Sequence, residues 1–283
     1  MSKTKDRIRE SQLRYRHELG QNFLYDEALL ARLAEAAGVT REEDVLEIGP
    51  GVGSLTRHLC SRARRVLSIE LDERLVPLLQ AYMTGQDNFS LVQGDVMKLN
   101  LPEVTRDLKA PFHVVANIPY YITTPLIQLL LTAGLPLKSM ALMVQREVAE
   151  KLLAGPGQEG WGPLAVRCRY FTEPRLALDV PAACFTPPPK VDSAFVVMPF
   201  RAEPAVHPAD EADFFRVVGA AFSLRRKTLV NALMATLRLP REAAAALVTG
   251  AGLDLRVRGE QLSLSEFAAV SDAWTAYRKE QET

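Results

Sequence analysis

Residues 45–54 read VLEIGPGVGS, an apolar run that leads into three glycines at alternate positions. The run from 45 to 48 predicts a buried β-strand, and Ser54 predicts the start of a helix. Glycine adopts backbone conformations that other residues rarely adopt, so these glycines predict a sharp turn whose backbone can approach a ligand closely. Strand, turn and helix together predict the first unit of an α/β sheet.

The same alternation of strand and helix continues through the first two-thirds of the chain. Further apolar runs predict strands at 66–70, 89–93, 112–116 and 140–144. Amphipathic segments between them predict helices, including 28–37, 71–82 and 125–133. Nearly unbroken apolar runs are typical of parallel strands covered on both faces. We therefore predict a doubly wound, Rossmann-like α/β sheet.

The pattern changes after Phe200. Residues 201–208 contain two prolines and no periodic apolar signal, and helical patterns follow without intervening strands. The predicted helices are 212–222, 225–237, 241–251 and 265–279. We predict an α/β domain at 1–203 and a small all-helical domain at 204–283.

The composition is that of a folded protein with no net charge. Hydrophobic residues make up 48% and charged residues 24% of the 283 residues, which disfavours intrinsic disorder. Lys plus Arg and Asp plus Glu both number 34, so nucleic-acid binding would depend on the local arrangement of charge. Three scattered cysteines predict neither a disulfide framework nor a Cys-based zinc site, and we expect no bound metal.

We expect a cytoplasmic protein without a membrane span. The first residues, MSKTKDRIRE, lack the apolar segment of a secretory signal. The longest uncharged stretch, 110–137, is long enough to cross a bilayer, but it contains four prolines and Asn117. The sequence does not define the oligomeric state, and a monomer is the working expectation.

Glu47 stands at the end of the first predicted strand, before the loop formed by Gly49, Gly51 and Gly53. The loop has the spacing G-x-G-x-G, whereas a dinucleotide site has G-x-G-x-x-G. A carboxylate beside the loop would repel a pyrophosphate but attract the ammonium and sulfonium groups of S-adenosylmethionine. The charge of Glu47 therefore favours S-adenosylmethionine as the cofactor.

Two more acids stand at strand ends. Glu70 closes the second predicted strand, where a ribose is recognised in such folds, and is expected to accept hydrogen bonds from both ribose hydroxyls. Asp95 follows the third strand and is expected to accept from the amine of the cofactor's adenine. The alternative is an ordinary glycine turn with solvated acids, but three acids at successive strand ends favour the cofactor site.

Asn117-Ile118-Pro119-Tyr120 follows the fourth predicted strand, at the edge where open α/β sheets bind ligands. An adenine amine is a poor nucleophile because its lone pair is delocalised into the ring. The Asn117 side-chain oxygen and the Ile118 carbonyl are each expected to accept one amino hydrogen, with Pro119 directing that carbonyl. Tyr120 offers a flat face for stacking the target base. The alternative is an ordinary turn with a buried tyrosine.

With these motifs, the sequence closely resembles the ribosomal RNA adenine N6,N6-dimethyltransferase family, in particular its bacterial kasugamycin-sensitivity members. The resemblance covers nearly the whole chain. Its other motifs are LGQNFL at 19–24, FTPPPKVDS at 185–193 and RRKT at 225–228. The Asn117 motif is shared with many amino-methyltransferases, whereas GQNFL and FTPPPKVDS are much more specific to this family.

The resemblance implies a class I methyltransferase fold that uses S-adenosylmethionine. It implies dimethylation of two adjacent adenosines in a hairpin loop near the 3′ end of 16S small-subunit rRNA, on an assembling ribosomal particle. It also implies that Phe185 lies on the opposite face of the target base from Tyr120. The cofactor contacts that it implies are Asn22, Leu24, Gly49, Glu70, Asp95 and Asn117.

Arg225, Arg226 and Lys227 begin a predicted helix, where positive charge interacts unfavourably with the helix dipole. Positive charges in this unfavourable position indicate an anionic partner. We therefore predict that these residues contact RNA and that the domain at 204–283 helps to dock it. The alternative is that they pair with nearby acids.

Two rival functions remain open. A macrolide-resistance methyltransferase modifies an adenine of 23S rRNA by the same chemistry, but the FTPPPKVDS and RRKT segments argue against it. A ribosome-assembly factor could keep the fold without the activity, but intact acids and an intact Asn117 argue against lost catalysis.

Overall fold

The computed structural model describes residues 22–224 and 226–281, so Leu19–Gln21 of the LGQNFL motif and Arg225 lie outside the described residues. By its internal contacts the chain divides into two compact units. The first holds the described residues up to Ala149 together with 173–200, and the second holds 150–172 together with the described residues from Arg201 onward. The first of the three crossings between the units falls within helix α7 (Arg146–Leu153), and the others lie at 172/173 and 200/201.

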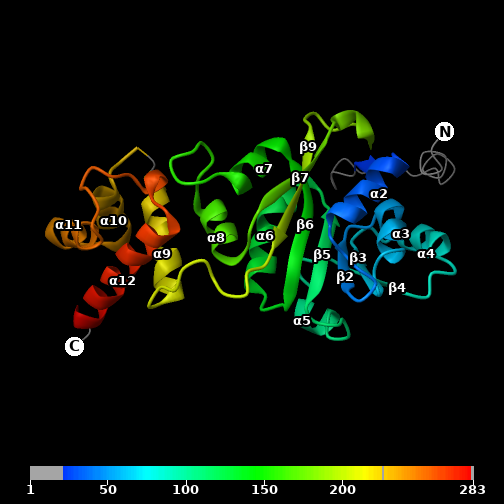
Figure 1. The fold of residues 1–283 in the computed structure, drawn as a ribbon, viewed down its shortest axis with the longest axis horizontal. Helices are drawn as coiled ribbons and strands as arrows, with labels where there is room; N and C mark the ends of the chain where they lie inside the picture. Colours follow the sequence, from blue (N-terminus) through cyan, green and yellow to red (C-terminus); the bar gives the residue numbers. More distant parts are fainter. Residues whose placement is uncertain (1–21, 225, 282–283) are drawn as a thin grey trace. The chain divides into compact units, whose positions relative to one another are not determined.

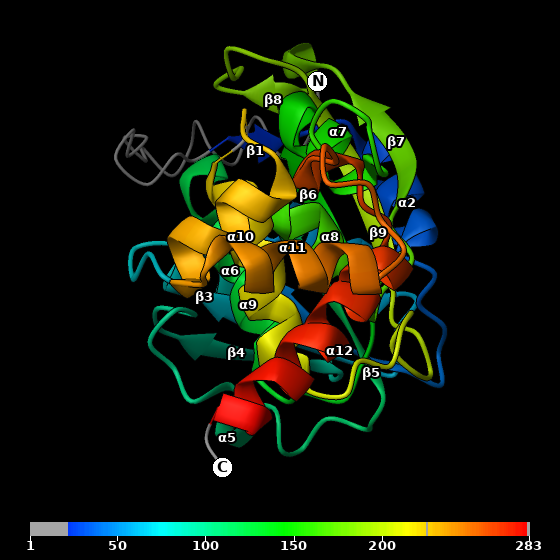
Figure 2. The same cartoon turned by 90° about the vertical axis from the view of Figure 1, so that its left-hand side faces the viewer.

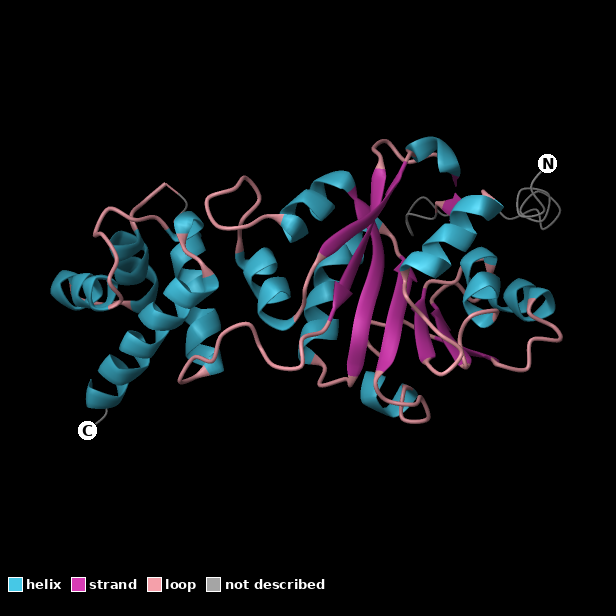
Figure 3. Cartoon of the chain, in the orientation of Figure 1, coloured by secondary structure: helices cyan, strands magenta, loops and turns pink. Residues whose placement is uncertain are grey.

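The first unit is built on a seven-stranded sheet, drawn in magenta in Figure 3. The strands are β2 (Asp44–Ile48), β3 (Arg65–Glu70), β4 (Phe89–Gln93), β5 (Phe112–Asn117), β6 (Leu137–Gln145), β7 (Arg175–Val180) and β9 (Ser193–Pro199). Their order is β4-β3-β2-β5-β6-β9-β7. The chain runs outward from β2 to β4 in one direction and from β5 to β6 in the other, so the order reverses between β2 and β5. Ligands bind at such a point in open α/β sheets.

Helices flank the strands of this sheet (Figure 1). They are α2 (Glu27–Ala36), α3 (Ser54–Cys60), α4 (Val76–Tyr82), α5 (Leu101–Val104) and α6 (Thr123–Thr132), with the short 3-10 helices η2 (Tyr120–Ile122) and η3 (Ala182–Cys184). Leu30 and Leu33 of α2 share one core cluster with Val45 and Val115 of the sheet. Leu46, the neighbour of Val45 that points to the other face, is also fully buried. Both faces are therefore covered, as the apolar runs predicted.

The sheet differs from the prediction at one edge. The five predicted strands pair in parallel, but β9 is antiparallel to both β6 and β7. The strands β1 (Phe23–Leu24) and β8 (Phe185–Thr186) form a separate antiparallel pair. Antiparallel pairing of β9 with β6 joins residues far apart in the sequence, such as Ser139 and Pro199, and periodicity alone does not reveal such a pairing.

The second unit is helical. Its elements are α8 (Pro163–Phe171), α9 (Glu211–Ser223), α10 (Leu229–Leu237), α11 (Arg241–Gly250), η4 (Gly259–Gln261) and α12 (Leu264–Gln281). Figure 2 shows α9 to α12 gathered together, and Phe214 and Phe267 are fully buried in their common core.

The predicted domain boundary at 203/204 leaves out part of this unit. Residues 150–172 belong to it because their aromatic side chains join its core. Trp161 Nε1 donates to the Leu262 carbonyl at 2.9 Å, and the Tyr170 and Phe214 rings lie 5.1 Å apart. The chain therefore enters the helical unit, returns to the sheet for β7 to β9, and enters it again.

Two predicted helix starts were wrong, since α4 begins at Val76 rather than at 71, and α10 begins after 225. Helix α10 begins at Leu229, because Thr228 is its N-cap and its hydroxyl accepts from the Asn231 N–H at 3.5 Å. Arg226 and Lys227 are exposed in the turn before that cap rather than in the first helical turn. The argument from the helix dipole therefore fails for these two residues, while their exposure leaves them accessible to an anion.

The uncharged stretch 110–137 folds into β5, η2 and α6, and leads into β6. Within 22–224 and 226–281, we find no helix with the length and hydropathy that a membrane crossing requires.

Gly259→Ala is expected to destabilise the second unit by about 1–3 kcal/mol. An added Cβ would lie 2.5 Å from the Ala221 carbonyl oxygen of α9, which the backbone cannot easily move. Gly219→Ala is the matched control, since its Cβ would meet nothing within 4 Å and it lies inside α9. The control should stabilise by about 0.5–1 kcal/mol. Urea unfolding followed by circular dichroism measures both, and equal stability of the two variants would contradict this packing.

Candidate active site

A cavity of about 210 Å³ opens at the carboxyl ends of β2, β3 and β5, where the strand order reverses. Its walls come from the glycine loop, the segments after β3 and β4, and the Asn117 motif, and β1 and β8 contribute Phe23, Leu24 and Phe185. It brings together twelve of the predicted site residues, namely Asn22, Leu24, Glu47, Gly49, Gly51, Glu70, Asp95, Asn117, Ile118, Pro119, Tyr120 and Phe185.

The glycine loop turns as its sequence predicts. Gly49, Gly51 and Gly53 have φ values of 71°, 58° and 85°, a region that side-chain-bearing residues rarely adopt. Gly53 does not line the cavity; it is the N-cap of α3, and a Cβ there would lie 2.7 Å from Leu79 of α4. The absence of a side chain at Gly53 therefore allows α4 to pack closely against the loop.

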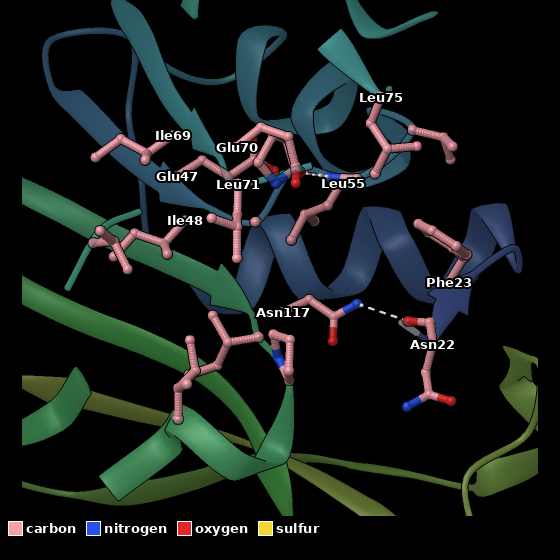
Figure 4. A pocket seen from close by; sticks show the side chains of 18 of the residues that line it. Asn22, Phe23, Glu47, Ile48, Leu55, Ile69, Glu70, Leu71, Leu75 and Asn117 are labelled. Atoms are coloured by element: carbon pink, nitrogen blue, oxygen red, sulfur yellow. Dashed lines mark hydrogen bonds between the residues drawn. The ribbon is translucent and has the colours of Figure 1, made fainter. Parts of the chain in front are cut away.

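Glu70 is fixed by the backbone of the loops around it. Its carboxylate accepts from the Gly51 N–H at 3.0 Å (Figure 4) and from the Asp72 N–H at 2.8 Å. The side chain is 5% exposed, and burial raises its pKa even though these hydrogen bonds lower it. Each carboxylate oxygen has a second lone pair with which it can accept from a ligand.

Glu47 is more deeply buried, at 1% exposure, and accepts from the Ser68 hydroxyl at 2.7 Å. The parallel register of β2 and β3 places Ser68 directly beside it. Burial raises the pKa of Glu47 to about 7, and the nearby charge of Glu70 adds to that rise. No Lys or Arg among the described residues forms an ion pair with Glu47 or Glu70.

Asp95 lies at the other side of the cavity, after β4. Its carboxylate accepts from the Met97 N–H at 3.0 Å and pairs with Lys98 at 3.5 Å. These bonds hold the Asp95 side chain at the cavity wall.

Asn117 ends β5 with its side chain in the cavity. Its Nδ2 donates to the Asn22 carbonyl at 3.5 Å, as the dashed line in Figure 4 shows. Because the nitrogen is used in this way, the Asn117 Oδ1 is turned away from Asn22 and remains available as an acceptor. The N-terminal segment thus orients the amide on which the proposed chemistry depends.

Tyr120 follows in η2, and a residue far along the chain holds its ring. The Tyr120 hydroxyl hydrogen-bonds to Ser193 Oγ at 2.6 Å. Burial raises the pKa of Tyr120. Ser193 begins β9 and ends the FTPPPKVDS motif, so the structure connects this motif to the ring.

Phe185 lines the same cavity from β8. Its backbone pairs with Leu24 in β1, and the Tyr25 hydroxyl donates to the nearby Ala183 carbonyl at 2.7 Å. Phe185 is 2% exposed, so only a small part of its ring reaches the open cavity.

Sequence reasoning missed several residues of the cavity, including Phe23, Leu71, Met97 and Tyr121. Each adjoins or lies close to a residue that was predicted, so proximity to the motifs was the available signal. Tyrosine is often largely buried, but Tyr121 is 58% exposed. Arg226 and Lys227 lie in the other unit and do not line this cavity. Within the described ranges, no group of three or more His, Cys, Asp or Glu side chains is arranged to hold a metal.

The cavity fits a cationic adenosine cofactor. Two buried carboxylates with raised pKa values would gain from a positive ligand charge. With a glycine turn after the first strand and a mainly parallel sheet, this arrangement defines a class I methyltransferase that uses S-adenosylmethionine.

Comparison with known proteins defines the particular family. The model of the ribosomal RNA adenine dimethylase family matches residues 12–274, and the chain belongs to this family. The "Ribosomal RNA small subunit methyltransferase A" of Clostridium perfringens is 42% identical over 275 residues, covering 97% of this chain and 96% of that protein. The protein of the same name from Geobacillus thermodenitrificans is 40% identical, covering 96% of this chain and 94% of its own.

Solved structures show the same fold. The crystal structure of a dimethyladenosine transferase from Plasmodium falciparum matches with a TM-score of 0.78 at 25% identity, covering 92% of this chain and 98% of that one. The 23S rRNA methyltransferase ErmE matches with a TM-score of 0.71 at 30% identity, covering 89% and 99%. The predicted fold class, enzyme class and cofactor are therefore confirmed.

Glu47→Gln is expected to raise the free energy of unfolding by about 3 kcal/mol above pH 7, because burial raises the pKa of Glu47 from its ordinary value of 4.5 to about 7. The folded protein binds the Glu47 proton more tightly than the unfolded chain does, so wild-type stability falls as the pH rises from about 4.5 to 7. The variant lacks this loss, and the difference between the two should vanish near pH 4.5. Urea unfolding at pH 5, 6, 7 and 8 measures it.

Glu43→Gln provides a control of opposite sign. Hydrogen bonds from Lys138 and Thr40 outweigh burial there and lower the pKa of Glu43 to about 2. The charged form is therefore stabilised in the fold, so this variant should be less stable at neutral pH, with a deficit that disappears as the pH falls toward 2. A difference between Glu47→Gln and wild type that stays constant from pH 5 to pH 8 would show that the Glu47 charge carries no such cost.

Proposed function

We propose that this protein transfers methyl groups from S-adenosylmethionine to the N6 amines of two adjacent adenosines near the 3′ end of 16S rRNA. The support for the small subunit is the 40–42% identity, across nearly the whole chain, to proteins named ribosomal RNA small subunit methyltransferase A. The Ser193 contact with Tyr120 further supports it, because that contact gives FTPPPKVDS a function at the base-binding end of the cavity.

The residues assigned to the cofactor line one cavity, so the proposed site is complete without a second copy, and we propose that the protein acts as a monomer. Bound S-adenosylmethionine supplies an electrophilic methyl group on a sulfonium. Glu47 balances its positive charge, Glu70 accepts from the ribose hydroxyls, and Asp95 accepts from the adenine amine. The backbone of Asn22 and the glycine turn, together with Leu24, shape the space around it.

Asn117 and Ile118 act on the target amine. The Asn117 Oδ1 and the Ile118 carbonyl each accept one N6 hydrogen, which draws the nitrogen lone pair out of conjugation with the ring. S-adenosylmethionine would supply the methyl group, and the methylated amine would then be acidic and release its proton to water or to a carbonyl. Pro119 has no N–H to compete for the Ile118 carbonyl and restricts its direction.

Tyr120 and Phe185 hold the base. A base that reaches the cavity must leave its stack, and an aromatic face replaces the lost contact, which is worth about 1–3 kcal/mol. The Ser193 hydrogen bond, which holds the Tyr120 ring in place, supports this role for Tyr120.

RNA docking is assigned to 204–283 with Arg225, Arg226 and Lys227. The support is the exposure of Arg226 and Lys227 in a turn just before α10. Phosphate contacts of this kind position an RNA without reading its sequence. The substrate is a small subunit still being assembled, in the cytoplasm.

Asn117→Ala is expected to lower the methylation rate at saturating substrate by at least about 100-fold, because it removes one acceptor from the amine. Cofactor affinity should stay within about threefold, since Glu47 and Glu70 are retained. Single-turnover methylation and calorimetric titration with S-adenosylmethionine measure the two. Glu70→Ala is the reciprocal control, and its cofactor affinity should fall by more than its methylation rate at saturating substrate. If Asn117→Ala lost rate and affinity to the same degree, the division of roles would be wrong.

The substrate is tested with labelled cofactor and separated ribosomal subunits that lack the modification. Label should enter the small subunit, and mass mapping should place two methyl groups on each of two adjacent adenosines. Label in the large subunit would support the macrolide-resistance activity, which the likeness to ErmE keeps as the second candidate. No label in either, with normal cofactor binding, would favour a non-catalytic assembly factor.

A further inference from the structure

Exposed apolar side chains gather at the cavity. Seven large hydrophobic side chains are exposed in the described part of the chain, and three of them, Leu71, Met97 and Tyr121, line this cavity. Single exposed apolar residues are ordinary, but a group at the mouth of a ligand cavity indicates a surface that a ligand covers. Tyr121 is the most exposed of the seven, at 58%.

Tyr121 differs from its neighbour Tyr120 in how it is held. The Tyr120 ring is partly buried and its hydroxyl bonds to Ser193, whereas no hydrogen bond of the Tyr121 hydroxyl is found among the described residues. Both belong to η2, and successive side chains of a 3-10 helix point about 120° apart. The two rings therefore cannot serve the same face of one base, and Tyr121 presents an open ring beside the place assigned to the target.

We propose that Tyr121 stacks on the nucleotide next to the target adenosine and is a specificity-determining residue for a substrate with paired adenosines. The inference rests on the proposed function. When one base leaves its stack, its neighbour loses a stacking partner. An exposed aromatic ring beside the cavity can replace that partner, since every base has a face on which an aromatic ring can stack.

The stacking would act before and after the first transfer. While one adenosine occupies the cavity, its neighbour rests against Tyr121, and the two then exchange places. Loss of the ring should therefore weaken RNA binding in both transfers.

Tyr121→Ala should raise KM for under-methylated small subunits about 5- to 150-fold, the range of one base–aromatic stack, and should change kcat by less than about threefold. Cofactor affinity should be unchanged. Tyr121→Phe keeps the ring and should behave like wild type. Leu176→Ala is the matched surface control, because Leu176 is 41% exposed but does not line the cavity.

A double-mutant cycle separates stacking from a general structural effect. The adenosine next to the target is replaced by uridine, which stacks more weakly, in small subunits that are otherwise identical. The wild-type enzyme should lose affinity with this change, and Tyr121→Ala should lose much less. Equal losses for both enzymes, or a Tyr121→Ala KM within twofold of wild type, would overturn the inference. Failure of the proposed function is distinguishable, because then wild-type enzyme would place no label on the adjacent adenosines.

Discussion

Two carboxylates are buried at the ends of neighbouring strands with only neutral hydrogen-bond donors around them. Glu47 receives the Ser68 hydroxyl, and Glu70 receives the backbone N–H groups of Gly51 and Asp72. Burying an ionised group without a countercharge costs free energy of folding. Packing elsewhere in the first unit must therefore offset the cost of burying Glu47 and Glu70. The parallel register of β2 and β3, together with the glycine turn, keeps both acids facing one cavity.

The parts predicted from the sequence are those determined by local pattern. Strands such as β4, found at the predicted residues 89–93, follow from short apolar runs, and the turn at Gly49 follows from glycines whose φ is positive. The acids could be placed because the ends of parallel strands meet at one edge of the sheet. Site residues whose function depends on their position at the end of a strand can therefore be predicted from the sequence.

The parts that were missed depend on contacts between distant residues. Ser193 holds Tyr120 across 73 residues, and Trp161 bonds to Leu262 across 101. No local pattern marks either pair, so the function of FTPPPKVDS and the membership of 150–172 in the helical unit could not be predicted. The start of α10 is a different case, because Thr228 is a residue type that favours the N-cap, so the sequence does contain a local signal for the observed start.

The short ladder between β1 and β8 has a consequence for the timing of synthesis. Phe23 pairs with Thr186, so the segment that orients Asn117 obtains its partner only when the chain has grown past β8. Tyr120 obtains its anchor later still, at Ser193. A nascent chain that has already emerged with the glycine loop and both acids therefore lacks the contacts that position Asn117 and Tyr120 until β8, and then Ser193, have been synthesised.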